Sequence, residues 1–232
     1  MKLSIVVPAH NEQDNIANVI ERIERSLSFD YELVIVDDNS TDETAELVQG
    51  LSRKYGNIKL VHNKSGKGFA NALKTGFSKV STDIVIPVMA DLCDDLDSIP
   101  LMLDKLNQGY DIVCGSRYIK GGARLGGSKV KGFLSFCAGR SLSFLLGLPT
   151  HDIANAFKMY RKKVIDSIDV KSEAFEISME IPLKAYYSGF KIAEIPTVWK
   201  ERARGQSNFR VLKLLPAYIK LYIWAVLKRL TK

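Results

Sequence analysis

The first 88 residues alternate between short runs of β-branched residues and longer segments with apolar residues at helical spacing. The short runs predict buried strands, and the longer segments predict amphipathic helices. We expect strands at 3–8, 31–36, 58–61 and 83–88, and helices at 12–27, 42–54 and 69–79. Strands and helices that alternate in this way form a parallel sheet with right-handed crossovers. The predicted fold class is therefore α/β.

The second half of the sequence is less regular. It predicts helices at 97–108 and 173–188, and strands at 111–116, 153–160 and 190–199. Glycines and basic residues dominate 119–132, which predicts a mobile basic loop. An interrupted apolar segment follows at 133–148, and the last predicted helix, 209–230, carries basic residues on one side and a break near Pro216.

Composition excludes several classes of protein. With 232 residues, 46% of them apolar and 25% charged, the chain is expected to form one folded domain. Three cysteines are too few for a disulfide framework, which favours a reducing compartment. The N-terminal apolar run is too short for a signal peptide. No stretch approaches the roughly 20 uninterrupted apolar residues of a membrane span.

The net charge of +7 suits a partner that carries phosphate. No nucleic-acid-binding motif is present, so nucleic acid is not the expected partner. Acidic motifs fill residues 12–104, whereas basic residues gather from 117 onward. This distribution predicts an acidic site that faces a basic one.

Polar clusters follow three of the predicted strands, at 9–12, 37–42 and 90–95. In open parallel sheets, ligands bind beyond the carboxyl ends of the strands. We therefore expect these three clusters to converge at one rim of the sheet.

Six segments carry a family resemblance, and they occur in a fixed order: PAHNE (8–12), DDNSTDET (37–44), NKSGKGFANALKTG (63–76), MADLCDD (89–95), SRYIKGG (116–122) and RARGQSN (202–208). Together they resemble the inverting family-2 glycosyltransferases of GT-A fold, and among these the polyprenyl-phosphate hexose synthases, such as the dolichol-phosphate mannose synthases. The resemblance implies one GT-A, Rossmann-like domain over 1–232. Within it, 1–95 would bind the nucleotide-sugar, 96–208 the acceptor, and 209–232 would form an amphipathic helix.

The resemblance places the nucleotide-sugar pocket at the strand ends and the glycine-rich turn. The implied residues are Pro8, Ala9, His10, Glu12, Val36, Asp37, Asp38, Lys67, Gly68, Ala90 and Asp91. Carboxylates such as Glu12 and Asp38 accept hydrogen bonds from a base or from ribose hydroxyls. Gly68 opens a predicted helix, whose N-terminus favours anions. The alternative is that Asp37, Asp38 and Asp42 only cap a helix.

Asp91 is the expected metal ligand, because a diphosphate leaving group needs charge neutralisation by a cation such as Mg²⁺ or Mn²⁺. The family pattern here is Asp-Ala-Asp followed by Leu-Gln, and this chain has Met89 and Cys93 in place of the first Asp and the Gln. Methionine is a poor ligand for magnesium. Asp94 and Asp95 are possible substitutes, and the donor diphosphate itself can supply ligands. The alternative is that Asp91 is an ordinary loop residue.

Arg117, Lys131 and Arg202 are the candidates for binding the acceptor phosphate, since arginine suits bidentate phosphate recognition. A surface ion pair is the alternative for each of them. Asp152 would act as a general base on a sugar hydroxyl, or would orient the acceptor if the acceptor is a phosphate. The predicted catalytic set is therefore Asp91, Arg117, Arg202 and Asp152.

The expected function is transfer of a hexose, with inversion, from a nucleoside-diphosphate hexose to a polyprenyl phosphate such as dolichyl or undecaprenyl phosphate. The protein would be cytoplasmic and attached peripherally to the cytoplasmic face of a membrane through 133–148 and the last helix. Two alternatives stay open. One is a saccharide acceptor with Asp152 as base, and the other is a degenerate nucleotide-sugar-binding protein, which Met89 would mark.

Overall fold

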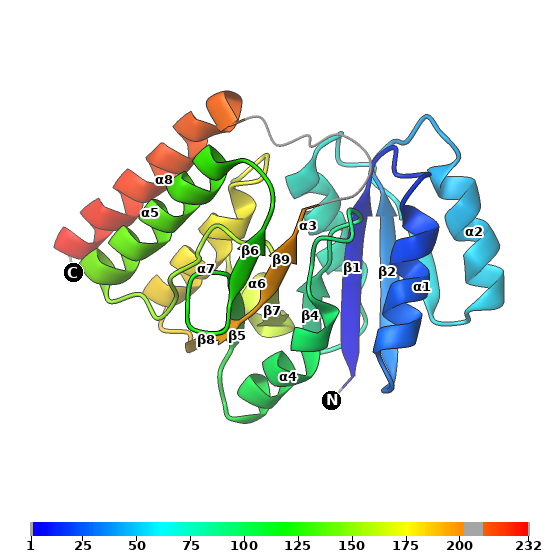
Figure 1. Ribbon diagram of the computed structural model, residues 1–232, viewed down its shortest axis with the longest axis horizontal. Helices are drawn as coiled ribbons and strands as arrows, with labels where there is room; N and C mark the ends of the chain where they lie inside the picture. Colours follow the sequence, from blue (N-terminus) through cyan, green and yellow to red (C-terminus); the bar gives the residue numbers. More distant parts are fainter. Residues whose placement is uncertain (1, 202–210, 232) are drawn as a thin grey trace.

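The computed structural model describes residues 2–201 and 211–231, and its centre is a seven-stranded sheet (Figure 1). The strand order is β3-β2-β1-β4-β7-β5-β8. The strands are β1 (Leu3–Ala9), β2 (Tyr31–Asp37), β3 (Ile58–His62), β4 (Ile84–Pro87), β5 (Ile112–Ser116), β7 (Lys158–Arg161) and β8 (Ile192–Pro196). Only β7 runs antiparallel to its neighbours within this sheet, so the prediction of a mainly parallel α/β fold is confirmed.

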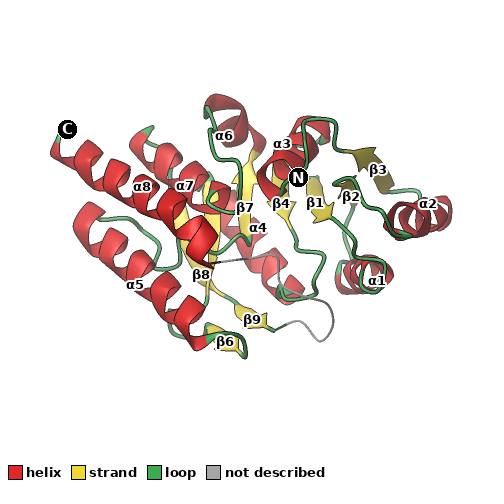
Figure 2. Cartoon of the chain, turned by 90° about the horizontal axis from the view of Figure 1, so that it is seen from above, coloured by secondary structure: helices red, strands yellow, loops and turns green. Residues whose placement is uncertain are grey.

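Helices cover both faces of the sheet, as Figure 2 shows from above. One face packs against α1 (Ile16–Ser26), α2 (Thr44–Lys54) and α4 (Ile99–Asn107), which follows a 3₁₀ turn, η1 (Leu96–Ser98). The other face packs against α3 (Phe69–Lys79), α6 (Lys162–Ser167) and α7 (Ile177–Tyr187). In β1, Ile5 and Val7 point to the first face and Val6 to the second. Burial on both faces explains why the central residues of β1 and β2, Ile5–Val7 and Leu33–Val36, are all apolar.

Two long helices, α5 (Lys129–Leu146) and α8 (Val211–Leu230), pack beside α7 at the end of the molecule away from β3 (Figure 2). A small core that includes Leu142, Leu183 and Ala225 joins these three helices. The predicted break at Pro216 is wrong, because α8 continues through it. Pro216 lies inside the helix and removes one backbone donor, and the packing of α8 against α5 and α7 in the core that includes Ala225 stabilises the helix across it.

Three predictions for the second half need correction. The segment 119–132 is not simply a loop: it contains β6 (Ala123–Leu125), which pairs in parallel with β9 (Val198–Lys200), and the start of α5. The strand predicted at 190–199 is two strands, β8 and β9, in different sheets. The strand predicted at 153–160 begins only at Lys158, and α6 was not predicted. Besides a backbone hydrogen bond of Gly115 to Phe157, the side chains of Asn155 and Lys158 hold residues 153–157.

Across the described part of the chain, none of the helices combines the length and apolar character that a membrane span requires.

Candidate functional site

The carboxyl ends of β1 and β2 bring two of the predicted polar clusters together. The backbone N–H of Asp38 donates to the carbonyl oxygen of Ala9 at 2.8 Å, and His10 Nδ1 lies 2.9 Å from the carbonyl oxygen of Asp38. The Asn11 side chain accepts a 2.8 Å hydrogen bond from the backbone N–H of Thr41. The first two clusters therefore share one rim, as predicted from the strand order.

Backbone strain concentrates at this rim. Among the residues that the structure describes, three non-glycine residues have a positive φ: Asn11 (53°), Asn39 (58°) and Leu92 (61°). They lie in the loops that follow β1, β2 and β4. Non-glycine residues seldom adopt this conformation, and such strain gathers at ligand-binding sites. The three loops together are thus the best candidate for a site.

Asp38 fastens the glycine-rich turn to the rim. Its Oδ1 accepts from Asn63 Nδ2 at 2.7 Å, and its Oδ2 accepts from the backbone N–H of Gly68 at 2.8 Å. Gly68 has a φ of 142°, which favours glycine at the start of α3. The neighbouring Asp37 is also buried and accepts from the backbone N–H of Ser40 at 3.2 Å. Both carboxylates therefore shape the rim.

The other predicted nucleotide-site residues fall into three groups. Pro8, Ala9, Val36 and Ala90 are buried, and the Val36 side chain packs in the core with α3, which leaves only backbone atoms for a ligand. Lys67 is exposed beside Gly68. Glu12 accepts from Asn15 Nδ2 at 2.8 Å.

Asp42 belongs to the start of α2. Its Oδ1 accepts from the backbone N–H of Thr44 at 3.0 Å and from the Thr44 hydroxyl at 2.5 Å. Burial raises the pKa of Asp42, but these hydrogen bonds outweigh it and lower the pKa below its usual value. A helix-start role for Asp42 is the alternative that the sequence left open.

The loop after β4 is held from within and from α1. Asp91 Oδ1 accepts from the backbone N–H of Cys93 at 3.1 Å, and Asp94 Oδ2 accepts from that of Met89 at 2.8 Å. Arg22 of α1 donates to the carbonyl oxygens of Leu92 and Asp94, at 2.9 and 3.2 Å. Sequence reasoning missed Arg22, because nothing in its own helix marks it as a partner of a loop 70 residues away.

Burial, followed by the charge of Asp91, raises the pKa of Asp94 to about 7. The Met89 N–H and the cations Arg117 and Arg22 oppose this rise. Strands β4 and β5 both run antiparallel to β7, which lies between them, so their carboxyl ends lie at the same edge of the sheet. The acidic loop after β4 and Arg117 after β5 therefore share this edge.

The side chains of this loop fit only one kind of metal site. No group of three His, Cys, Asp or Glu residues that would hold a metal ion occurs within 2–201 and 211–231. Asp94 is buried and accepts from the Met89 N–H, and Asp95 accepts from the Ser98 hydroxyl at 2.8 Å, so both carboxylates have partners within the protein. Mg²⁺ is commonly held by one or two carboxylates together with substrate phosphates. Asp91 with a donor diphosphate fits that arrangement.

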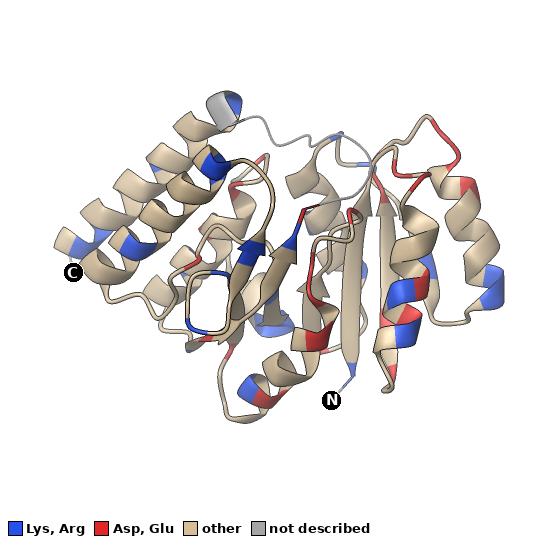
Figure 3. Cartoon of the chain, viewed as in Figure 1, with Lys and Arg blue, Asp and Glu red and all other residues tan. Residues whose placement is uncertain are grey.

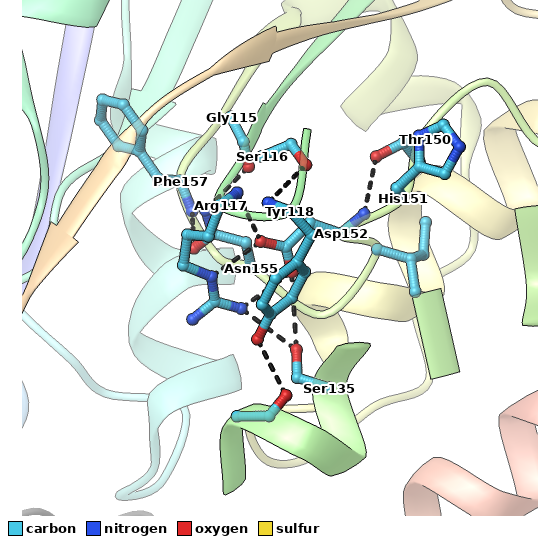
Figure 4. A network of polar contacts seen from close by, with 12 residues as sticks. Gly115, Ser116, Arg117, Tyr118, Ser135, Thr150, His151, Asp152, Asn155 and Phe157 are labelled. Atoms are coloured by element: carbon cyan, nitrogen blue, oxygen red, sulfur yellow. Dashed lines mark hydrogen bonds and ion pairs between the residues drawn. The ribbon is translucent and has the colours of Figure 1, made fainter. Parts of the chain in front are cut away.

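Arg117 and Asp152 form a buried ion pair between the end of β5 and the loop that follows α5 (Figure 4). Arg117 Nε donates to Asp152 Oδ2 at 2.7 Å, and Nη2 donates to Oδ1 at 2.8 Å and to the Ser135 hydroxyl at 3.1 Å. The side chains are 11% and 0% exposed. Burial alone would lower the pKa of Arg117, but the hydrogen bonds and charge of Asp152 outweigh it and raise the pKa further.

A second layer of buried polar groups holds the loop that carries Asp152. Asn155 Nδ2 donates to the carbonyl oxygen of Gly115 at 2.8 Å. Lys158, which is fully buried, donates to the carbonyl oxygens of Ile153 at 2.9 Å, Ser178 at 3.2 Å and Asn155. Burial lowers the pKa of Lys158 to about 8. This lysine was not predicted, because a lone lysine in a short strand gives no sign of its burial.

Glu194 of β8 fixes the start of the same loop. It accepts from the backbone N–H of His151 at 2.5 Å, and its other oxygen lies 2.8 Å from His151 Nδ1. His151 therefore has a structural partner, Glu194.

The two remaining phosphate-site candidates are placed differently. Lys131 lies in the first turn of α5, where its backbone N–H donates to the Ser128 side chain at 3.4 Å. Arg202 lies outside the described residues. The structure therefore brings Asp91, Arg117 and Asp152 to one region and leaves Arg202 as a prediction.

Comparison with known sequences identifies the family. The sequence model of "Glycosyl transferase family 2" matches residues 4–169. The chain belongs to this family. It is 34% identical over 215 residues to a dolichol-phosphate mannosyltransferase of Pyrococcus furiosus, covering 90% of this chain and 60% of that protein. It is 26% identical over 235 residues to a polyprenol monophosphomannose synthase of Mycolicibacterium smegmatis, covering 98% and 88%.

The fold is shared with an enzyme whose crystal structure is known. Glucosyl-3-phosphoglycerate synthase from Mycobacterium tuberculosis, crystallised with Mn²⁺, UDP and glucosyl-3-phosphoglycerate, superposes with a TM-score of 0.72 at 20% identity. The match covers 98% of this family-2 chain and 79% of the synthase. It confirms the expected GT-A fold. The chain spans only 60% of the first relative's length, so that protein's substrates do not transfer with the family name.

Proposed function

We propose that this chain transfers a hexose, with inversion, from a nucleoside-diphosphate hexose to a polyprenyl phosphate. The observation that carries the proposal is that the loop of Asp91 and Asp94 follows β4 and Arg117 follows β5, and the carboxyl ends of these two strands lie at the same edge of the sheet. A leaving diphosphate held near Asp91 and an acceptor phosphate held by Arg117 would then lie on adjacent parts of one rim. The two relatives named above, a dolichol-phosphate mannosyltransferase and a polyprenol monophosphomannose synthase, support the same substrate classes.

The chemistry needs little from the protein besides position and charge. A phosphate oxygen of the acceptor attacks the anomeric carbon, the bond from that carbon to the diphosphate oxygen breaks, and the electron pair leaves with the nucleoside diphosphate. A phosphate oxygen is already ionised near neutral pH, so no general base is required. Arg117 would hold the nucleophile in line with the leaving group. A divalent cation bound with the donor diphosphate would neutralise the leaving group, and Asp91 would hold it.

Asp152 favours a phosphate acceptor over a saccharide acceptor. Its carboxylate is fully buried and accepts three hydrogen bonds from Arg117, counting the backbone N–H at 3.0 Å. A carboxylate so engaged is poorly placed to remove a proton from a sugar hydroxyl. In the proposed reaction Asp152 orients Arg117.

The surface of α5 and α8 supports contact with a membrane. Most of the exposed large apolar side chains lie on these two helices: Val130, Phe133, Leu134, Phe136, Phe144, Leu145, Ile219, Ile223, Leu227 and Leu230. Neither helix contains an acidic residue, and both carry Lys or Arg (Figure 3). Exposed apolar surface with basic residues suits an anionic lipid surface. We include peripheral attachment at the cytoplasmic face in the proposal.

The first experiment is a thermal-shift screen of GDP, UDP and their hexose derivatives, with and without Mn²⁺. A ligand that binds the folded state raises the melting temperature. The ligand found is then incubated with polyprenyl phosphate, and released nucleoside diphosphate is measured. Asp91→Asn should abolish the release of nucleoside diphosphate. The control variant Asp97→Asn, at an exposed position nearby, should release it at the wild-type rate. Binding without release would favour the degenerate nucleotide-sugar-binding protein, and no binding would refute the proposal.

A further inference from the structure

A chain of ring contacts leads from Arg117 to the outer surface of α5. The Arg117 guanidinium carbon lies 5.2 Å from the centre of the Tyr118 ring. The Tyr118 and Phe136 rings meet edge to face, with centroids 5.5 Å apart. The Arg140 guanidinium carbon lies 5.7 Å from the Phe136 ring centre. Figure 4 shows Tyr118 beside Arg117 at the inner end of this chain.

The rings are held in place by α5 itself. The Tyr118 hydroxyl donates to the carbonyl oxygen of Gly132 at 3.0 Å, and the Ser135 hydroxyl accepts from Arg117. At 3.6 residues per turn, Phe133, Phe136 and Phe144 lie on one side of the helix. These three residues, with Tyr118, form what we call the phenyl stripe. Phe136 is 38% exposed, Phe133 66% and Phe144 88%, so the stripe opens outward from the buried arginine.

The chemical groups along this surface, taken from the buried arginine outward, match one kind of ligand. A cation lies at the inner end, aromatic rings continue from it, and α5 offers no carboxylate that would repel an anion. An amphiphile with an anionic head and an apolar tail has the same order. Rigid aromatic side chains bury apolar surface at small entropic cost.

We propose that the first isoprene units of the acceptor lie against Tyr118 and Phe136 while its phosphate is bound at Arg117, an inference that rests on the proposed function. Phe136 is then a specificity-determining residue, which favours a prenyl phosphate over a phosphate without a lipid chain. This role differs from membrane attachment, because it concerns the chain of the reacting molecule and needs no bilayer.

The test uses citronellyl phosphate, a short water-soluble prenyl phosphate, as the acceptor in buffer without detergent or vesicles. Phe136→Ala should raise the acceptor KM roughly tenfold through lost apolar contact, with the donor KM unchanged. Phe136→Leu should recover most of the loss. Inhibition by inorganic phosphate should be equal in wild type and Phe136→Ala, because both retain Arg117. Leu101→Ala, which trims a 52% exposed residue on α4, is the matched control. Melting temperatures confirm that each variant folds.

The outcomes separate the two proposals. If the wild type transfers no hexose to any prenyl phosphate, the proposed function fails. If the wild type transfers to citronellyl phosphate but Phe136→Ala has the wild-type KM, or a KM raised no more than that of Leu101→Ala, the inference alone is wrong. The inference is also wrong if Phe136→Ala changes only transfer to long-chain acceptors in vesicles.

Discussion

Arg117 Nε lies 2.7 Å from Asp152 Oδ2, and a second hydrogen bond of 2.8 Å joins Arg117 Nη2 to Asp152 Oδ1. The two residues are 35 positions apart in the sequence. Arg117 follows β5 and Asp152 lies in the loop after α5, so the ion pair locks these two segments together. It also leaves the guanidinium only limited freedom to turn, which suits a group that must present a phosphate in one orientation.

Removal of the carboxylate should therefore destabilise the whole protein. In Asp152→Ala, Arg117 would be left as an uncompensated buried charge, and we expect the free energy of unfolding to fall by about 3–5 kcal/mol. Urea denaturation at pH 7 measures the loss. A decrease below about 1 kcal/mol would mean that the pair contributes little.

Asp152→Asn addresses the chemistry of the same residue. With a phosphate acceptor, the variant should lose activity through misplacement of Arg117, and its pH–rate profile should keep the wild-type shape. The measurement is kcat/KM from pH 5 to 9. Loss of the acidic limb in the variant, the fall in rate at low pH that protonation of a general base causes, would instead support a saccharide acceptor with Asp152 as the base.

Glu180 predicts a defined dependence of stability on pH. Its side chain is 2% exposed, lies 2.5 Å from Lys184 Nζ and accepts the backbone N–H of Ser172 at 2.7 Å. Burial raises the pKa of Glu180, but these partners outweigh it and lower the pKa below its ordinary value. A carboxylate whose pKa is lowered by folding stabilises the protein above its unfolded pKa, and this contribution disappears as the pH falls through the folded pKa.

Glu180→Gln should thus be less stable than wild type by about 2 kcal/mol at pH 7, and the difference should shrink as the pH falls below about 4. Urea titrations from pH 3 to 7 give both curves. Glu173→Gln, at an exposed position three residues before Glu176, is the matched control. If the difference in unfolding free energy stays constant over this range, the charge of Glu180 is not what stabilises its contacts with Ser172 and Lys184.

The first half of the fold could be predicted from the sequence, because both faces of its sheet are buried under helices. As a result, the central residues of β1 and β2 form continuous apolar runs, and each covering helix carries one apolar stripe. Strand β7 (Lys158–Arg161) was predicted with the wrong bounds, at 153–160. Its four residues begin with the buried Lys158, whose charge is satisfied only by carbonyl groups of Ile153, Asn155 and Ser178.

The small β6–β9 sheet depends on contacts that no local pattern records. Arg124 lies over the Trp199 ring at 4.9 Å, and the Gly127 N–H donates to Glu201 at 2.8 Å. At the site, residue types at the strand ends could be predicted, but their partners could not. The fastening of Gly68 by Asp38 and the pairing of Arg117 with Asp152 appear only when distant loops meet.

Membrane attachment can be tested on the outer parts of α5 and α8. Phe144 and Leu227 are 88% and 56% exposed. The double variant Phe144→Asp, Leu227→Asp places two carboxylates on a surface that has none, so binding to vesicles of anionic phospholipid should fall at least tenfold. Co-sedimentation measures it, with Leu101→Asp on α4 as control. Undiminished binding would remove these helices from the membrane contact.

Met89→Asp tests whether a missing carboxylate limits the metal site. The Met89 backbone N–H donates to Asp94 at 2.8 Å, and this bond is independent of the side chain. A carboxylate two residues before Asp91 would offer a second oxygen ligand beside the donor diphosphate. We expect Mn²⁺ to bind about tenfold more tightly in the presence of nucleoside diphosphate, equivalent to about 1.4 kcal/mol. Calorimetric titration measures the affinity, and Met89→Asn is the uncharged control. If the Asp and Asn variants bind Mn²⁺ as the wild type does, the side chain at 89 does not face the cation, and Asp91 with the diphosphate is sufficient.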